Sequence, residues 1–117
     1  MRISLHFNYR QRLNTTQICV VLYNFANQTA ADLYRKAYQL GELGTGYHYI
    51  LYKTGEAVAD RDIMAVASKR LPEGENSIYI LADTTEGKLS DAQNYWLKKF
   101  NADRDLPLKI IKNRGFI

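Results

Sequence analysis

The segment Gln17–Tyr23 has the sequence QICVVLY, in which five consecutive residues are apolar. β-Branched residues favour strands, and a strand this apolar indicates a central position in a sheet that is covered on both faces. Ser77–Ala82 (SIYILA) has the same character. The two segments predict a buried sheet with helices packed against it.

Two helices are predicted from their capping patterns. Thr29 is followed three residues later by Asp32, which is a capping-box pattern, and Gly41 and Gly44 end that helix. Ser90, with Gln93 at the same spacing, begins a second helix. The expected apolar faces are Ala30, Leu33, Ala37 and Leu40 in the first helix, and Ala92, Tyr95, Trp96 and Phe100 in the second.

The remaining strands are predicted at Ile3–Tyr9, in a hairpin of Tyr47–Lys53 and Ala57–Asp60, and at Leu106–Lys112. Arg61–Asn76 is a long irregular stretch, and such loops are often functional. The fold class is therefore α/β (α+β), a single mixed sheet of about six strands flanked by helices. We find no repeat or linker, so residues 1–117 are expected to form one domain.

Composition limits the class of protein. Hydrophobic residues make up 46% of the 117 residues and charged residues 24%, as in soluble globular domains. No apolar stretch approaches the roughly 20 residues of a membrane span, and Met1–His6 lacks the apolar core of a signal peptide. We therefore expect a cytoplasmic protein with no membrane partner. The single cysteine, Cys19, excludes a disulfide framework and is expected to be a buried small hydrophobe.

The net charge of +4 permits contact with nucleic acid but does not indicate it, because the basic residues are spread along the chain. A nucleic-acid binder is therefore kept as an alternative that rests only on charge and on the nine tyrosines.

The segment Gly46–Asp62 (GYHYILYKTGEAVADRD) is similar to the central motif of type 2 N-acetylmuramoyl-L-alanine amidases and peptidoglycan-recognition proteins, above all the phage lysozyme-amidases. The resemblance continues through Met64–Ser68 (MAVAS) and Asn76–Ile78 (NSI), and the alignable region spans Gln17–Lys112. It implies a mixed sheet and a catalytic zinc that is held by two histidines and a cysteine.

The zinc-ligand positions that the resemblance implies carry other residues here. The first histidine falls near Val21, and the second falls near Ile110 or Ile111. The cysteine would follow several residues later, whereas the only cysteine is Cys19. Aliphatic side chains cannot hold a dication, so we expect no metal, no cofactor and a pseudoenzyme without amidase activity.

Other residues of the motif have structural interpretations. A histidine of the family that follows the MAVAS stretch corresponds to Lys69. Tyr47 matches a catalytic tyrosine of the amidases but is expected to act as a sheet aromatic, and His48 as a hydrogen-bonded packing residue. Arg61 and Asp62 are expected to form a polar pair that fixes the loop. A metal site made from His6, His48 and Asp60 or Asp62 has no support in the spacing.

The sequence thus predicts a protein that works by binding. We expect a phage- or mobile-element-encoded inhibitor or adaptor that binds a host or phage protein complex. The target would be a defence complex, in an anti-CRISPR role, or an RNA polymerase. The predicted partner-binding residues line the former substrate groove: Tyr47, Tyr49, Arg61, Lys69 and Arg70. The alternatives are a peptidoglycan amidase and a non-catalytic peptidoglycan binder.

Overall fold

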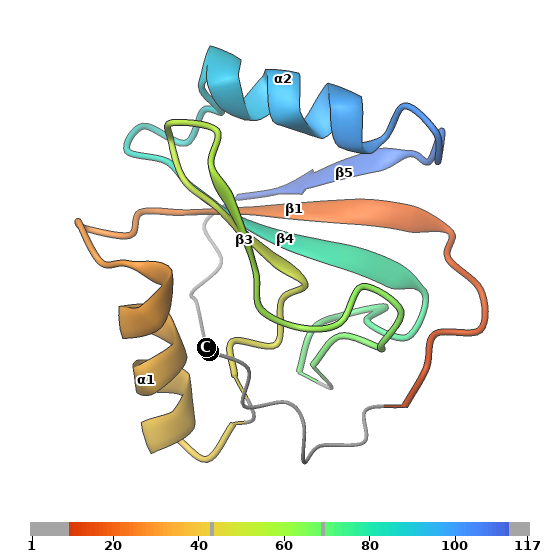
Figure 1. Ribbon diagram of the computed structural model, residues 1–117, viewed down its shortest axis with the longest axis horizontal. Helices are drawn as coiled ribbons and strands as arrows, with labels where there is room; N and C mark the ends of the chain where they lie inside the picture. The colour runs from red at the N-terminus through yellow and green to blue at the C-terminus, as the bar shows by residue number, and fades with distance from the viewer. Residues whose placement is uncertain (1–9, 43, 69, 113–117) are drawn as a thin grey trace.

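The computed structural model describes residues 10–42, 44–68 and 70–112, which fold as a single sheet with a helix on each face (Figure 1). Five strands lie in the order β3-β2-β4-β1-β5. The elements in chain order are β1 (Gln17–Tyr23), α1 (Ala30–Gln39), β2 (Tyr49–Leu51), β3 (Ala57–Ala59), β4 (Ser77–Asp83), α2 (Asp91–Phe100) and β5 (Leu108–Ile111).

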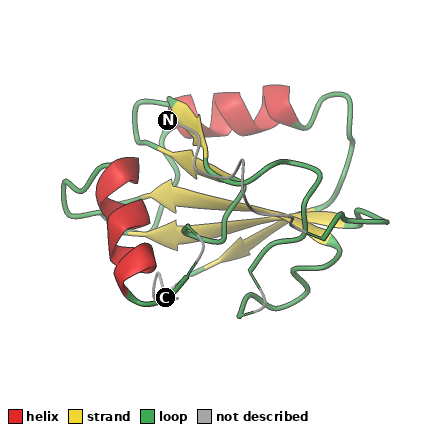
Figure 2. Cartoon of the chain, turned by 60° about the horizontal axis from the view of Figure 1, so that its bottom comes forward, coloured by secondary structure: helices red, strands yellow, loops and turns green. Residues whose placement is uncertain are grey.

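The sheet is mixed, as its sequence predicts. Strands β2, β4, β1 and β5 are parallel, and only the short edge strand β3 runs antiparallel to its neighbour. The carboxyl ends of the long strands therefore meet at one edge, beside α1, as their arrowheads in Figure 2 show. Their amino ends meet at the opposite edge. Side chains from distant parts of the chain converge at each of these two edges.

Two apolar clusters hold the layers together. On the α1 side, Leu33 and Ala37 of the helix pack with Val21, Ile50 and Leu81 of the sheet. On the α2 side, Leu97 packs with Ile18, Val20, Leu51 and Ile80. Residues Ile18–Leu22 are buried along their whole length because they contribute to both clusters in alternation, which confirms the expected central strand.

Both predicted helix starts are confirmed. The Thr29 side chain accepts a hydrogen bond from the Asp32 amide, the Asp32 side chain accepts one from the Thr29 amide, and Ser90 and Gln93 repeat the arrangement. The predicted helix faces are partly wrong. Leu40 is 60% exposed because it is the C-cap of α1, where the chain has left the helical path.

The buried face of α2 also differs from the expected one. Tyr95 is 64% exposed, whereas Leu97 and Gln93 are buried. Gln93 tolerates burial because its amide donates hydrogen bonds to the carbonyls of Leu51 and Asp83. Trp96 and Phe100 are half-buried at the margin of the same cluster.

Five of the six expected strands lie within the described residues. The hairpin strands and β5 are shorter than predicted, and the predicted strand Ile3–Tyr9, including His6, lies outside the described residues. Neither described helix is long and apolar enough to cross a membrane.

Candidate functional site

Val21 and Ile111 lie near the carboxyl edge of the sheet. Val21 of β1 and Ile111 of β5 are direct partners in the parallel ladder, so the two positions that the resemblance assigns to zinc-binding histidines are neighbours. Val21 is fully buried, and Ile111 packs against the cluster that Val21 shares with Phe25 of the loop leading to α1. Ile110 lies on the other face, where it is exposed. Of the two residues near the second implied ligand position, Ile111 is therefore the one that packs on the same face of the sheet as Val21.

The pair Val21–Ile111 does not fit a zinc ion. Neither side chain carries a nitrogen, oxygen or sulfur atom, and zinc sites in proteins take their ligands from those atoms. Cys19, two residues before Val21, is fully buried in the same cluster, as expected for a small hydrophobe. In the described ranges, no three His, Cys, Asp or Glu side chains are grouped so that they could hold a metal.

His48 lies between the sheet and the 61–68 loop and is fully buried. Its Nδ1 accepts a hydrogen bond of 2.9 Å from the Tyr79 amide, so the proton is on Nε2, which donates to the Ala65 carbonyl at 2.7 Å. Burial lowers the pKa of His48 to about 4, and the charges of Arg12 and Arg61 contribute to the shift. Both ring nitrogens are occupied, which confirms the prediction of a hydrogen-bonded packing residue.

Tyr47 lies on the α1 side of the sheet. It is fully buried, its ring meets Tyr79 edge-on with centroids 5.9 Å apart, and the Arg70 guanidinium lies 6.0 Å from its ring centroid. A ligand could reach this tyrosine only after the surrounding residues had moved. Tyr47 therefore acts as a packing residue in this structure.

Tyr49 lies on the opposite face of the sheet from Tyr47. The expectation that both tyrosines line one groove is therefore wrong. Tyr49 packs on the α2 side, with its ring centroid 5.4 Å from those of Trp96 and Phe100. Residues two apart share a face only within a strand, and β2 begins at Tyr49 itself. The bend at Gly46–His48 places Tyr47 on the opposite face.

A polar network fixes the loop that carries Tyr47. Arg70 pairs with Glu42 at 3.1 Å and donates a hydrogen bond to the Thr45 carbonyl. The Thr45 amide and hydroxyl both donate to Asp60. Burial raises the pKa of Asp60, and the two hydrogen bonds from Thr45 oppose that rise.

Gly46 is required at the centre of this network. Its φ of +88° is in the left-handed region, and a Cβ atom would lie 2.5 Å from the Ser68 Cβ. The sequence reveals the glycine through its place in the recognised motif. It does not reveal Glu42, Thr45 or Asp60, because their roles depend on contacts between distant segments.

Arg61 and Asp62 act separately, which corrects the expected pair. Arg61 is only 9% exposed and donates to the Val66 carbonyl at 3.0 Å. Asp62 is exposed and accepts a hydrogen bond from the Met64 amide. Within the described part of the chain, no ion pair joins them. Lys69, another predicted contact residue, lies outside the described residues.

Known structures share this fold. An N-acetylmuramoyl-L-alanine amidase endolysin from Clostridium intestinale matches with a TM-score of 0.63 and 21% identity, over 88% of this chain and 76% of that one. A peptidoglycan-recognition protein from Alvinella pompejana matches with a TM-score of 0.67 and 12% identity, over 92% and 78%. An endolysin from a Thermus scotoductus bacteriophage matches with a TM-score of 0.67 and 19% identity, over 87% and 75%.

The fold is therefore that of the type 2 amidases and peptidoglycan-recognition proteins, which confirms the resemblance and the fold class. No protein-family model matches the chain, and no curated protein sequence matches it.

Proposed function

We propose that this chain is a non-catalytic binding protein, an inhibitor or adaptor of a protein complex, built on an amidase-like fold. The observation that carries the proposal is the Val21–Ile111 pair, which fills two implied zinc-ligand positions with aliphatic side chains that belong to the core. Zinc activates the attacking water in metal-assisted amide hydrolysis. A chain without its ligands lacks that means of catalysis.

The target in this proposal is a host complex inside the cell, such as a CRISPR-type defence complex or an RNA polymerase. The bacteriophage endolysin among the structures that share the fold is in keeping with an origin in a phage or mobile element. Of the partner-binding residues predicted from the sequence, Arg70 is half-buried and Tyr47 and Arg61 are buried. Tyr47 and Arg61 would then position the surface, and exposed neighbours would make the contacts.

The test is capture of partners by tagged protein from lysates of candidate host cells, with mass spectrometry and zinc analysis of the same preparation. The proposal expects a stoichiometric protein partner and no bound zinc. A preparation that carries equimolar zinc and retains no protein would contradict it.

A second candidate is a peptidoglycan ligand, either as substrate or as a bound polymer. It is favoured by the matching structures, which include amidases and peptidoglycan-recognition proteins, and by the presence of Tyr47 on the α1 side. Co-sedimentation with insoluble peptidoglycan tests it. Because the chain carries a net charge of +4, binding must persist at high salt to count as specific.

A further inference from the structure

Strand β5 lies at the margin of the sheet and has one open side. It pairs with β1, and within the described part of the chain no strand pairs with its other side (Figure 1). The Ile18 amide of β1 donates to the Pro107 carbonyl at 2.9 Å, and Ile18 is the ladder partner of Leu108. Because backbone groups alternate between the two sides of a strand, the amides and carbonyls of Leu108 and Ile110 are directed to the open side. Such an edge is a template for another strand.

The same two residues also expose apolar side chains. Leu108 and Ile110 lie on the α2 face, because their ladder partners Ile18 and Val20 belong to the α2-side cluster. Leu108 is 44% exposed and Ile110 is 43% exposed. Strand β5 therefore combines outward backbone groups with exposed apolar side chains on one face.

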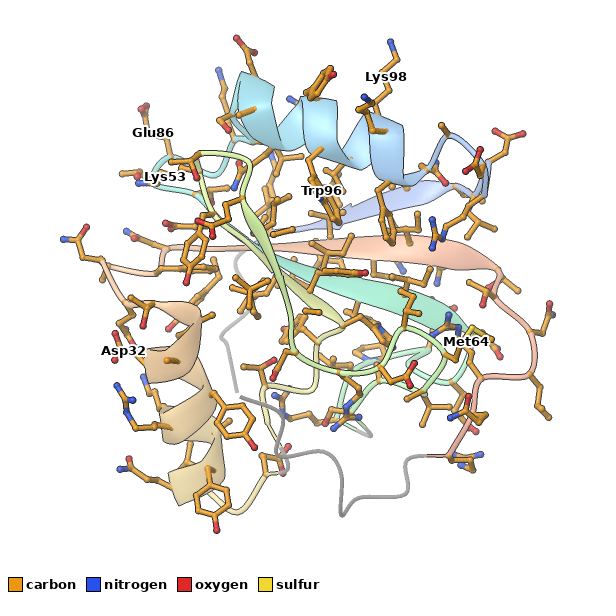
Figure 3. The ribbon with its side chains drawn as sticks, viewed as in Figure 1. Asp32, Lys53, Met64, Glu86, Trp96 and Lys98 are labelled. Atoms are coloured by element: carbon orange, nitrogen blue, oxygen red, sulfur yellow. The ribbon has the colours of Figure 1, made fainter. Side chains whose placement is uncertain are left out.

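Helix α2 leaves this strand partly uncovered because its aromatic residues pack towards the other side of the sheet. Figure 3 shows Trp96 directed from α2 towards the sheet and Lys98 directed away from it. The ring centroids of Trp96 and Phe100 each lie 5.4 Å from that of Tyr49 in β2. In the strand order, β4 and β1 separate β2 from β5.

We propose that β5 pairs with β5 of a second copy of this chain, so that the sheets of the two copies become continuous. The pairing is antiparallel, because a two-fold axis relates a strand to its own copy in the opposite direction. With the axis at Ile110, this residue lies opposite itself, and Leu108 lies opposite Lys112 of the second copy. These residues direct their backbone groups outward, so each forms a hydrogen-bonded pair.

The charges at the two ends of β5 suit an antiparallel copy. The turn before β5 carries two carboxylates, Asp103 and Asp105, and one guanidinium, Arg104, whereas Lys112 follows the strand; all four are exposed. Antiparallel pairing places Lys112 of each copy at the end of β5 that carries this turn in the other copy. The excess negative charge of the turn then attracts the lysine.

The lysine within β5 does not oppose the pairing. Lys109 lies on the α1 face, and its Nζ is 3.7 Å from a carboxylate oxygen of Glu73. In the proposed register it stands opposite Ile111 of the second copy rather than opposite another lysine, so no like charges face each other across the axis. A second copy therefore supplies a complement for the whole edge. The pairing goes beyond the proposed function, because it uses the margin of the sheet and no contact with another protein.

Cysteine cross-linking of the full-length chain tests the register. Cys19 is the only natural cysteine and is fully buried. Ile110→Cys should form a disulfide-linked dimer under mild oxidation, because partners in a hydrogen-bonded pair have Cα atoms about 5.5 Å apart, within the range of a disulfide. Leu108→Cys is the matched control, since it has the same exposure on the same face. It should not cross-link, because its counterpart lies several residues away along the paired strands.

Sedimentation equilibrium over a dilution series tests the association of the unmodified chain, which should be a reversible dimer. Ile110→Lys places two like charges opposite each other at the axis and should weaken the dimer about tenfold. Leu40→Lys makes the same change of charge at the exposed C-cap of α1, on the other face of the sheet, and should leave the dimer unchanged.

Hydrogen exchange of the Leu108 and Ile110 amides distinguishes a second copy from other occupants of the edge. We expect their protection to rise with protein concentration. Protection that does not change on dilution would overturn the inference, because the edge would then be covered within a single chain. A monomer at every concentration, or equal cross-linking of Ile110→Cys and Leu108→Cys, would also overturn it. Bound zinc or peptidoglycan hydrolysis would contradict only the proposed function, so the two failures can be told apart.

Discussion

The buried imidazole of His48 gives the domain a predictable sensitivity to acid. Burial holds the pKa of His48 at about 4, below the ordinary value of 6.5, so the folded state binds a proton less readily than the unfolded state does. The neutral ring therefore contributes stability that is complete above pH 6.5. This contribution is lost progressively as the pH falls toward 4.

The magnitude follows from the two pKa values. Their difference amounts to about 3 kcal/mol once titration is complete, because one pKa unit is worth about 1.4 kcal/mol. Between pH 7 and pH 5 the expected loss is about 2 kcal/mol. This is a large part of the stability of a small domain.

Urea denaturation at pH 7 and pH 5, followed by tryptophan fluorescence, measures this loss. The matched variant is His48→Gln, which keeps a polar side chain but does not titrate. Asp60 acts in the opposite direction, because its raised pKa lets the folded state gain stability on acidification, and comparison of the two proteins cancels its effect. If both proteins lost the same stability between pH 7 and pH 5, the account of His48 would be refuted.

Three further predictions concern the loops and caps, and each is measured by chemical denaturation. Gly46→Ala should lower the free energy of unfolding by well over the roughly 1–2 kcal/mol that a positive φ costs, because its Cβ would also clash with Ser68. Gly41→Ala has the same φ of +88° but open space around the Cβ, so it should cost only the conformational part. Equal losses of stability in the two variants would contradict this. Ser90→Ala should lose about 1 kcal/mol, because α2 loses its N-cap and the Lys53 carbonyl loses a donor; an unchanged midpoint would contradict it. Arg70→Glu should destabilise the fold by about 1–3 kcal/mol, since it breaks the pair with Glu42 and leaves the Thr45 carbonyl without this donor; a fully stable variant would contradict it.

The structure agrees with the sequence where local rules decide. The caps at Thr29 and Ser90 depend on residues three positions apart, so both could be read from short patterns. The central strand Gln17–Tyr23 was also predictable, because an apolar run of that kind cannot face water. The resemblance placed implied ligand positions near Val21 and near Ile110 or Ile111, and the structure adds that Val21 and Ile111 are ladder partners.

The sequence-based expectations differ from the structure where distant contacts decide. Gln93 is buried because two carbonyls from other elements accept its hydrogen bonds, and the sequence shows neither of them. Tyr49 was expected to line the same groove as Tyr47, but the bend before β2 places the two rings on opposite faces of the sheet. Arg12 gave no local signal, since its burial depends on the loop that carries Ala65.

We propose above all that this chain does not hydrolyse peptidoglycan. The most direct test is an assay of muropeptide release from purified peptidoglycan, with protein that has been incubated with zinc and then freed of excess metal. The account predicts no release above that of a protein-free control. Release that depends on the protein and is abolished by a chelator would contradict it, because Val21 and Ile111 would then stand at positions that catalysis does not need.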